Sequence, residues 1–217
     1  MRLADYSILT NAGPEIAVVS TKAFTAQLSV LLLLSYAVDR RYREGKVLIE
    51  KTAKAIEKML TSKFLSNLEI IARKLEDKKH IYVIGKGQNY PIALEVALKI
   101  KEASYIHGEG FAAGELKHGV ITLIEKGTPC IVLLGNDADS DYVLGSATEM
   151  KTRGGYIIGI GPKENEVFDE FIKVPDIAET SAIINTPPVQ LLAYYLAIIR
   201  GNNPDRPRNF AKSVTVK

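Results

Sequence analysis

The stretch Ile81-Tyr82-Val83-Ile84-Gly85-Lys86-Gly87-Gln88-Asn89-Tyr90-Pro91 decides the fold. A short run of residues with high strand propensity ends in two glycines, and a proline then suits the first turn of a helix. An apolar strand that passes directly into a helix is typical of a parallel sheet covered on both faces. We therefore predict a strand over 81–84 and a helix from Pro91 to about His107.

The same alternation continues toward the carboxyl terminus. The apolar runs 130–134, 156–161 and 171–174 predict three further strands, and helices are predicted over 141–151 and, after Pro187-Pro188, over 189–200. Strands that alternate with helices indicate an α/β fold, a doubly wound parallel sheet flanked by helices. We expect this domain to span residues 47–201.

The first third of the chain has helical periodicity. Apolar residues recur every three or four positions from Ser20 or Thr21 to Arg43, and again over 47–77, with Gly45 as the expected break and Ser62 or Ser66 as a second one. The most apolar stretch, 28–38, is shorter than the roughly 20 residues that cross a bilayer. It predicts a buried helix and no membrane span.

Composition narrows the class of protein. The chain has 217 residues, 47% of them hydrophobic and 24% charged, which is typical of a soluble globular protein and excludes a disordered chain, a collagen or a disulfide scaffold. The net charge of +3 is too small for a nucleic-acid-binding body. The single cysteine, Cys130, and the absence of a signal segment favour the cytoplasm.

The loop from Gly85 to Tyr90 follows the first strand, where parallel sheets bind ligands. Its glycines and the next helix N-terminus suit an anion. The dinucleotide pattern G-x-G-x-x-G fails because Tyr90 takes its last position, and no P-loop is present. An anion site and a plain strand-to-helix turn are equally compatible with this loop.

Glu95, Lys99 and Glu102 stand at i, i+4 and i+7 of a helix that is otherwise apolar nearly all round. The stripe can be a solvated face with a helix-stabilising ion pair, or an acid–base array that lines a cleft and has shifted pKa values. Spacing alone favours the solvated face.

The segment 108–119 has four glycines and reads as a loop with a short helix from Gly114. His118 lies in it and can titrate near neutral pH, although a surface histidine is the simpler interpretation. His80 is expected to open a strand. No metal-ligand spacing is present, so we predict neither a metal nor a cofactor, and Cys130 is predicted to be a buried core thiol.

Several motifs together resemble one enzyme family. They are Gly13-Pro14-Glu15-Ile16, 20–25 (STKAFT), 90–95 (YPIALE), 98–102 (LKIKE), 104–107 (SYIH), 114–119 (GELKHG) and 206–216 (RPRNFAKSVTV). In this order they are similar to the isomerase part of glucosamine-6-phosphate synthase, or glutamine–fructose-6-phosphate aminotransferase (isomerizing). That resemblance implies sugar-isomerase (SIS) domains, flavodoxin-like and three-layered.

The resemblance also implies a reaction. The family opens fructose 6-phosphate, forms an imine with ammonia and moves a proton between C1 and C2, giving glucosamine 6-phosphate for UDP-N-acetylglucosamine synthesis. Position by position, it implies that Glu102 is the base, that Lys99 and Glu95 tune it, and that His118 assists ring opening from the neighbouring subunit of a homodimer. It further implies that Lys212 and Ala211 on the tail, and Val18 and Ser20, contact the sugar.

The sequence also departs from the family. No glutaminase nucleophile stands at the amino terminus, and no serine- and threonine-rich phosphate loop of a first SIS domain is present. We therefore expect residues 1–46 to be the edge of a first SIS domain, 47–201 a complete second one, and 202–217 a catalytic tail. A partner chain could carry the missing domains. The alternative function is a non-catalytic sugar-phosphate-binding module.

Overall fold

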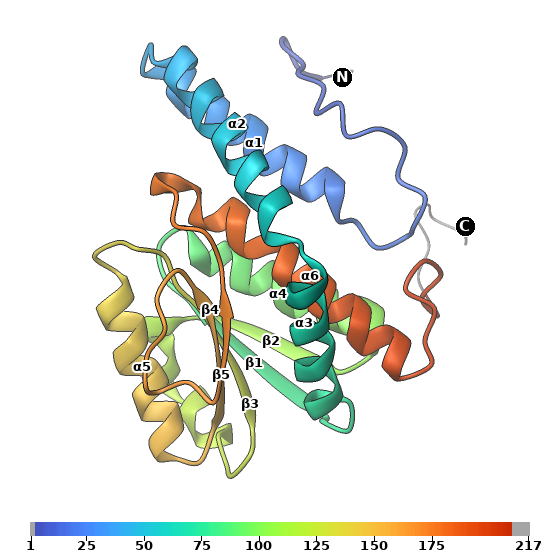
Figure 1. The fold of residues 1–217 in the computed structure, drawn as a ribbon, viewed down its shortest axis with the longest axis vertical. Coiled ribbons are helices and arrows are strands. Elements are labelled where there is room, and N and C mark those ends of the chain that lie inside the picture. The colour runs from blue at the N-terminus through green and yellow to red at the C-terminus, as the bar shows by residue number, and fades with distance from the viewer. Residues whose placement is uncertain (1–2, 210–217) are drawn as a thin grey trace.

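The computed structural model describes residues 3–209, and Figure 1 shows their arrangement. Helices α1 (Lys22–Val38), α2 (Tyr42–Met59) and α3 (Ser62–Leu75) come first. The remaining elements are β1 (His80–Gly85), α4 (Asn89–Ser104), β2 (His107–Ala112), the 3₁₀ helices η1 (Ala113–His118) and η2 (Val120–Leu123), β3 (Pro129–Leu133), α5 (Ser140–Thr152), β4 (Tyr156–Gly161), β5 (Glu170–Lys173), η3 (Ala178–Thr180) and α6 (Ser181–Ile199).

Within the described residues the sheet has five strands in the order β2-β1-β3-β4-β5. Every pairing is parallel, and His80 in β1 pairs with His107 in β2. The order reverses between β1 and β3, so their carboxyl ends form the switch point where such sheets commonly bind ligands. The predicted doubly wound α/β fold is confirmed.

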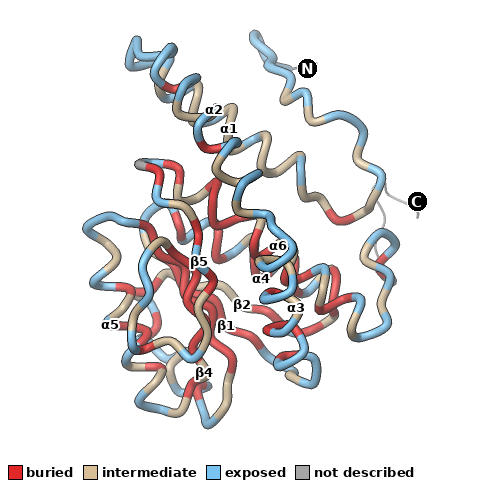
Figure 2. The backbone as a smooth tube through the Cα atoms, in the orientation of Figure 1, coloured by how far each residue is buried: buried red, intermediate tan, exposed pale blue. Residues whose placement is uncertain are grey.

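Alternate strand residues enter two cores. Ile81 and Val83 of β1 join a cluster with α3, α4 and α6, whereas Tyr82 and Ile84 join a second cluster with η1 and α5. Helices therefore cover both faces of the sheet, and Figure 2 shows the buried residues concentrated on the strands. This alternation is what the period-2 geometry of a strand requires when both of its faces are covered.

The edge strand β2 was not predicted, because 108–119 reads as a glycine-rich loop. A Cβ atom on Gly108 would lie 2.7 Å from the Ala97 carbonyl oxygen, and one on Gly110 would lie 2.6 Å from that of Ala93. The glycines therefore let α4 approach β2 backbone to backbone. The helix predicted to reach His107 ends at Ser104, and His107 opens β2 instead.

The last helix begins earlier than predicted. α6 starts at Ser181 rather than Val189 and contains Pro187 and Pro188 in its interior. Its buried residues Ile184, Leu192 and Leu196 fix it to the core, and this packing outweighs the cost of the prolines. α6 is long and apolar enough to cross a membrane, but 56% of its most apolar window is buried inside the protein.

The break at the first two helices differs from the prediction. α1 ends at Val38 rather than Arg43, and Arg40 turns the chain with a φ of 59°. Gly45 lies inside α2 and breaks nothing, because a Cβ there would lie 2.7 Å from the Cβ of Tyr36 in α1. Gly45 therefore permits the close contact between these helices.

Residues 28–38 are helical as predicted, but the prediction that this helix is buried was wrong. α1 has no buried residue, and Leu31 and Val38 are 61% and 86% exposed. α1 packs on α2 and on the outer side of α6, and both α1 and α2 extend away from the sheet (Figure 1). The predicted break near Ser62 does occur, and there the Thr61 hydroxyl accepts a hydrogen bond from the Phe64 amide.

Candidate functional site

Helix α4 brings Glu95, Lys99 and Glu102 into contact. The Lys99 Nζ atom lies 2.5 Å from Glu102 Oε2 and 3.5 Å from Glu95 Oε1. Residues three and four apart share one side of a helix, so the ammonium lies between the two carboxylates. The opposite side of α4 packs Ala93 and Ala97 onto β2, which fixes the direction in which the stripe faces.

This stripe is not a solvated face. The side chains of Lys99, Glu95 and Glu102 are only 5%, 13% and 15% exposed. Burial raises the pKa of the Glu95 carboxyl above its ordinary value of 4.5, the Lys99 ammonium opposes that rise, and the Glu102 carboxylate adds to it. The structure thus contradicts the solvated face that spacing alone suggests, and Lys99 is the member of the stripe that lines a cavity.

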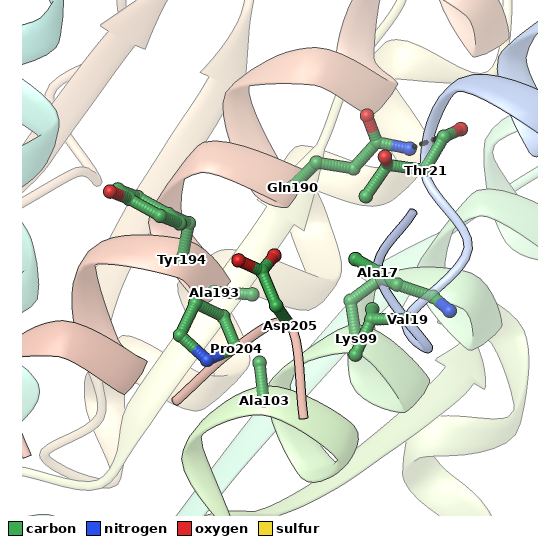
Figure 3. Close-up of a pocket in the computed structure, with 10 residues that line it drawn as sticks. All are labelled: Ala17, Val19, Thr21, Lys99, Ala103, Gln190, Ala193, Tyr194, Pro204 and Asp205. Atoms are coloured by element: carbon green, nitrogen blue, oxygen red, sulfur yellow. Dashed lines mark hydrogen bonds between the residues drawn. The ribbon is translucent and has the colours of Figure 1, made fainter. Parts of the chain in front are cut away.

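A cavity of about 170 Å³ lies beside Lys99, between α4 and α6 (Figure 3). Segments far apart in the sequence close it: the amino-terminal segment, α4, α6 and the segment that follows α6. Its lining residues are Ala17, Val19, Thr21, Lys99, Ala103, Gln190, Ala193, Tyr194, Pro204 and Asp205. Its walls are mostly apolar, with a few polar groups, which is the usual composition of a small-molecule site.

Hydrogen bonds join the amino-terminal segment to α6 and to the segment that follows α6 at this cavity. The Val18 amide donates a hydrogen bond to the Asp205 carbonyl at 3.1 Å, and the Gln190 side chain donates one to the Thr21 carbonyl at 3.1 Å (Figure 3). Val18 and Ser20, the predicted sugar contacts, are half-buried and alternate with lining residues. Sequence reasoning missed Gln190, although an amide side chain within the apolar run 188–199 is a usable signal.

His118 does not meet the stripe within one chain. It ends η1, its side chain is 71% exposed, and its Nδ1 atom lies 3.0 Å from Glu115 Oε2. η1 packs Ala113 and Leu116 into the core cluster on the face of the sheet opposite to α4. The sheet itself therefore stands between His118 and Lys99.

Two predicted site residues, Ala211 and Lys212, lie outside the described residues. The tail is described as far as Asn209, and its start is tied to the Val18 amide through the Asp205 carbonyl.

The loop after β1 has the geometry of a strand-to-helix turn closed by polar contacts. Lys86 pairs with Asp139 at 2.8 Å, and the buried side chain of Asn185 donates hydrogen bonds to Asn89 Oδ1 and the Leu134 carbonyl. Within residues 3–209, Asn185 Oδ1 is the buried side-chain atom without a hydrogen-bond partner. Sequence reasoning missed this asparagine pair.

Two further predictions concern metals and the thiol. No cluster of three or more potential metal ligands occurs within residues 3–209. Cys130 is fully buried in β3, and burial raises the pKa of its thiol to about 12. The prediction of a buried core thiol is confirmed.

The five-stranded parallel sheet with this order, and the charged stripe of α4 beside a small cavity, are features of a doubly wound α/β domain with a ligand site. The SIS domain model matches residues 74–200, more than half of the chain. The chain belongs to the SIS domain family.

Within the SIS domain family, the chain is most informatively compared with three named proteins. The chain is 46% identical over its whole length to the glutamine–fructose-6-phosphate aminotransferase (isomerizing) of Pyrococcus horikoshii, of which it covers 37%. The C-terminal domain of glucosamine-fructose-6-phosphate aminotransferase from Francisella tularensis superposes with a TM-score of 0.85 at 34% identity, covering 94% of this chain and 61% of that one. A glucosamine-6-phosphate deaminase from Thermotoga maritima gives a TM-score of 0.71 at 25% identity, covering 93% of this chain and 59% of that one. The chain thus spans little more than a third of the curated relative's length.

Proposed function

We propose that this chain is the isomerase part of a glutamine–fructose-6-phosphate aminotransferase. It would convert fructose 6-phosphate and ammonia to glucosamine 6-phosphate, in the supply of UDP-N-acetylglucosamine in the cytoplasm. The observation that carries this proposal is the buried contact of Lys99 with Glu102 and Glu95 beside a cavity. A protein that only binds a sugar phosphate has no need of a buried acid–base array.

Glu102 is the general base in this mechanism. After ring opening and imine formation at C2, its carboxylate takes a proton from C1, and the electron pair left on C1 forms the C1–C2 double bond. The former C2–N π pair moves to nitrogen, which takes up a proton, and this gives an enol-type intermediate. Protonation at C2, with loss of the C1 hydroxyl proton as C1 becomes a carbonyl, then gives the aldose amine. Lys99, 2.5 Å away, holds the carboxylate in place, and Glu95, with its raised pKa, serves as a proton relay.

His118 assists ring opening from a neighbouring copy of the chain. Its exposure and its position across the sheet from Lys99 support this arrangement, because within one chain the sheet lies between the two residues. The active form is therefore a homodimer, in which each site uses His118 of one copy and Glu102 of the other.

The remaining sugar contacts come from Val18, Ser20, Ala211 and Lys212. A cavity of about 170 Å³ is smaller than the roughly 300 Å³ at which ligand pockets begin. This supports a site that is completed by further protein, which would grip the phosphate. The exposed apolar residues Leu31 and Val38 on α1 offer a surface for a domain of that kind, in the same polypeptide or in a partner chain.

Proton exchange tests the proposal directly. The protein is incubated with fructose 6-phosphate and ammonium in deuterated water, alone and with a separately expressed first SIS domain from a relative. We expect deuterium at C1, and its loss by at least ~10²-fold in Glu102→Gln, the usual scale for a general base. Glu57→Gln, on the exposed side of α2, is the matched control.

The same experiment identifies the alternative function. Binding of fructose 6-phosphate, measured by calorimetry, without exchange under either condition would indicate a non-catalytic sugar-phosphate-binding module. The absence of both binding and exchange would contradict both functions.

A further inference from the structure

Two of the three histidines of the chain face each other at the amino end of the sheet. His80 opens β1 and His107 opens β2, and the register of these parallel strands places the two residues side by side. Their Nδ1 atoms lie 3.2 Å apart, and their rings meet edge to face with centroids 5.2 Å apart. The proposed reaction uses neither residue.

The strand backbones hold this histidine pair in place. The residues next to the two histidines in the chain, Ile81 and Ile106, are 0% and 1% exposed in the core. The His107 amide also donates a hydrogen bond to the Lys79 carbonyl at 3.1 Å. Both histidines are themselves exposed. A fixed backbone therefore presents two imidazoles that solvent and solutes can reach, which is the arrangement that a preorganised ligand site needs.

The histidine pair lies on the opposite face of the sheet from α4. Side chains alternate along a strand, so His80 shares the face of Tyr82, and His107 shares the face of Phe111. Tyr82 and Phe111 pack with the core cluster of η1 and α5, whereas Gly108 meets the backbone of α4. The pair is therefore separate from the charged stripe of α4 and from the cavity beside it.

The spacing of the two nitrogens matches the coordination of a divalent cation by imidazole. Histidine nitrogens bind Zn²⁺ at about 2.0–2.1 Å. Two nitrogens 3.2 Å apart, each at that distance from one ion, subtend about 100–106° at the ion, near the tetrahedral angle of about 109°. Because both side chains are exposed, small turns of the rings direct both lone pairs at one point. Without an ion, one ring must carry its proton on Nδ1 while the other presents a lone pair.

Water would complete the coordination of such an ion. No third histidine, cysteine or carboxylate joins the pair within residues 3–209. A hollow of about 340 Å³ beside His80 leaves room for water, and Asp77, Glu125, Lys79 and Lys126 are among the residues that line it. Two protein ligands, surrounded by charges of both signs, predict a site that exchanges its ion with solvent more readily than a closed four-ligand zinc site does.

We propose that His80 and His107 form a two-histidine site for a divalent cation of the Zn²⁺ type, which clamps the edge strand β2 to β1. Imidazole suits Zn²⁺, Ni²⁺ and Cu²⁺, whereas Mg²⁺ prefers oxygen ligands. β2 has a single neighbour in the sheet, so an ion that ties its first residue to β1 opposes local opening of the strand. This site goes beyond the proposed function and does not depend on it.

Zinc titration of the untagged chain tests the site. Calorimetry with ZnCl₂ at about pH 7.5 should give one ion per chain, because neutral imidazole is the ligand form of histidine. We expect the affinity to fall at least about tenfold in His80→Gln and in His107→Gln, and to stay unchanged in His118→Gln, the exposed third histidine. With a chelator present, the parent and the variants should melt at the same temperature, which separates ligand loss from misfolding.

Hydrogen exchange measures the clamp. Saturating ZnCl₂ should slow amide exchange over 107–112 and raise the melting temperature in the parent and in His118→Gln, but not in His80→Gln. MgCl₂ at the same concentration should do neither. Absence of zinc binding by the parent, or equal affinity in all four proteins, would overturn the site, and so would an equal effect of MgCl₂. Zinc binding without slower exchange over 107–112 would overturn the clamp.

Discussion

The Lys99 ammonium and the Glu102 carboxylate lie 2.5 Å apart, one helical turn from each other, with side chains that are 5% and 15% exposed. The ion pair is almost completely removed from water, so its members depend on each other more than a surface pair does. Removing the cation leaves Glu102 and Glu95 as partly buried carboxylates without their common partner.

Lys99→Met should therefore destabilise the fold and reduce activity. The variant keeps the apolar stem and loses the charge, and we expect a loss on the order of 3 kcal/mol at neutral pH. The loss should be smaller at lower pH, because the raised pKa of Glu95 favours its neutral form there. Urea unfolding at about pH 8 and about pH 5 measures the difference. Lys101→Met, on the exposed side of α4, is the control. Equal stability of Lys99→Met and the parent at both values would contradict the dependence.

The raised pKa of Glu95 predicts a second effect of pH on the stability of the fold. Its raised pKa means that the folded chain retains the carboxyl proton at pH values where the unfolded chain has released it. The stability from this group is therefore complete below the ordinary pKa of 4.5 and is lost as pH rises through the folded-state value.

Glu95→Gln removes this loss. The melting temperature of the variant should rise relative to the parent between about pH 4 and about pH 7, because the amide cannot ionise. Glu50→Gln, on exposed α2, should track the parent throughout. A constant difference between Glu95→Gln and the parent across the whole range would show that no pKa shift of Glu95 underlies it.

Gly110→Ala tests the close contact of β2 with α4. The added methyl group would lie 2.6 Å from the Ala93 carbonyl oxygen, and backbone atoms cannot move aside cheaply. We expect destabilisation of about 1–3 kcal/mol by denaturant unfolding. Gly145→Ala, where nothing lies within 4 Å of the new atom in α5, should instead stabilise by about 0.5–1 kcal/mol. A neutral Gly110→Ala would mean that the helix does not need this approach.

Cys130 should be unreactive in the folded protein. Burial raises the pKa of its thiol to about 12, so almost no thiolate is present near pH 8. A chromogenic disulfide reagent should titrate close to no thiol per chain in buffer and one per chain in guanidinium chloride. Rapid labelling of the folded chain would show that β3 opens readily.

The sequence predicts those parts of the fold whose residues prefer one local structure. β1, β3 and β4 are runs of β-branched and apolar residues, and strands form there. β2 escapes this reasoning because Gly108 and Gly110 have low strand propensity, and they are needed for the close backbone contact of β2 with α4. Spacing placed Glu95, Lys99 and Glu102 on one side of a helix, but it could not tell burial from exposure. The burial of Lys99, for example, involves segments 17–21 and 204–205, which are far from it in the sequence.

The tail contact at Tyr105 shows the same limit from the other direction. Nothing local in the sequence marks Tyr105, which follows α4 with a φ of 60°, as left-handed. Nor does anything local show that its hydroxyl accepts a hydrogen bond from the Arg208 amide, 103 positions later in the chain. Sequence motifs can select residues for a site, whereas contacts of this range come only from the fold.

The sheet that stands between His118 and Lys99 has a genetic consequence under the proposed function. Each chain would contribute its base to one site and its histidine to another, so two differently damaged gene copies could rescue each other. A cell that carries Glu102→Gln on one copy and His118→Ala on the other would assemble mixed pairs with one intact site each. The two damaged alleles would then complement each other, a pattern of inheritance set by which side of a sheet each residue occupies.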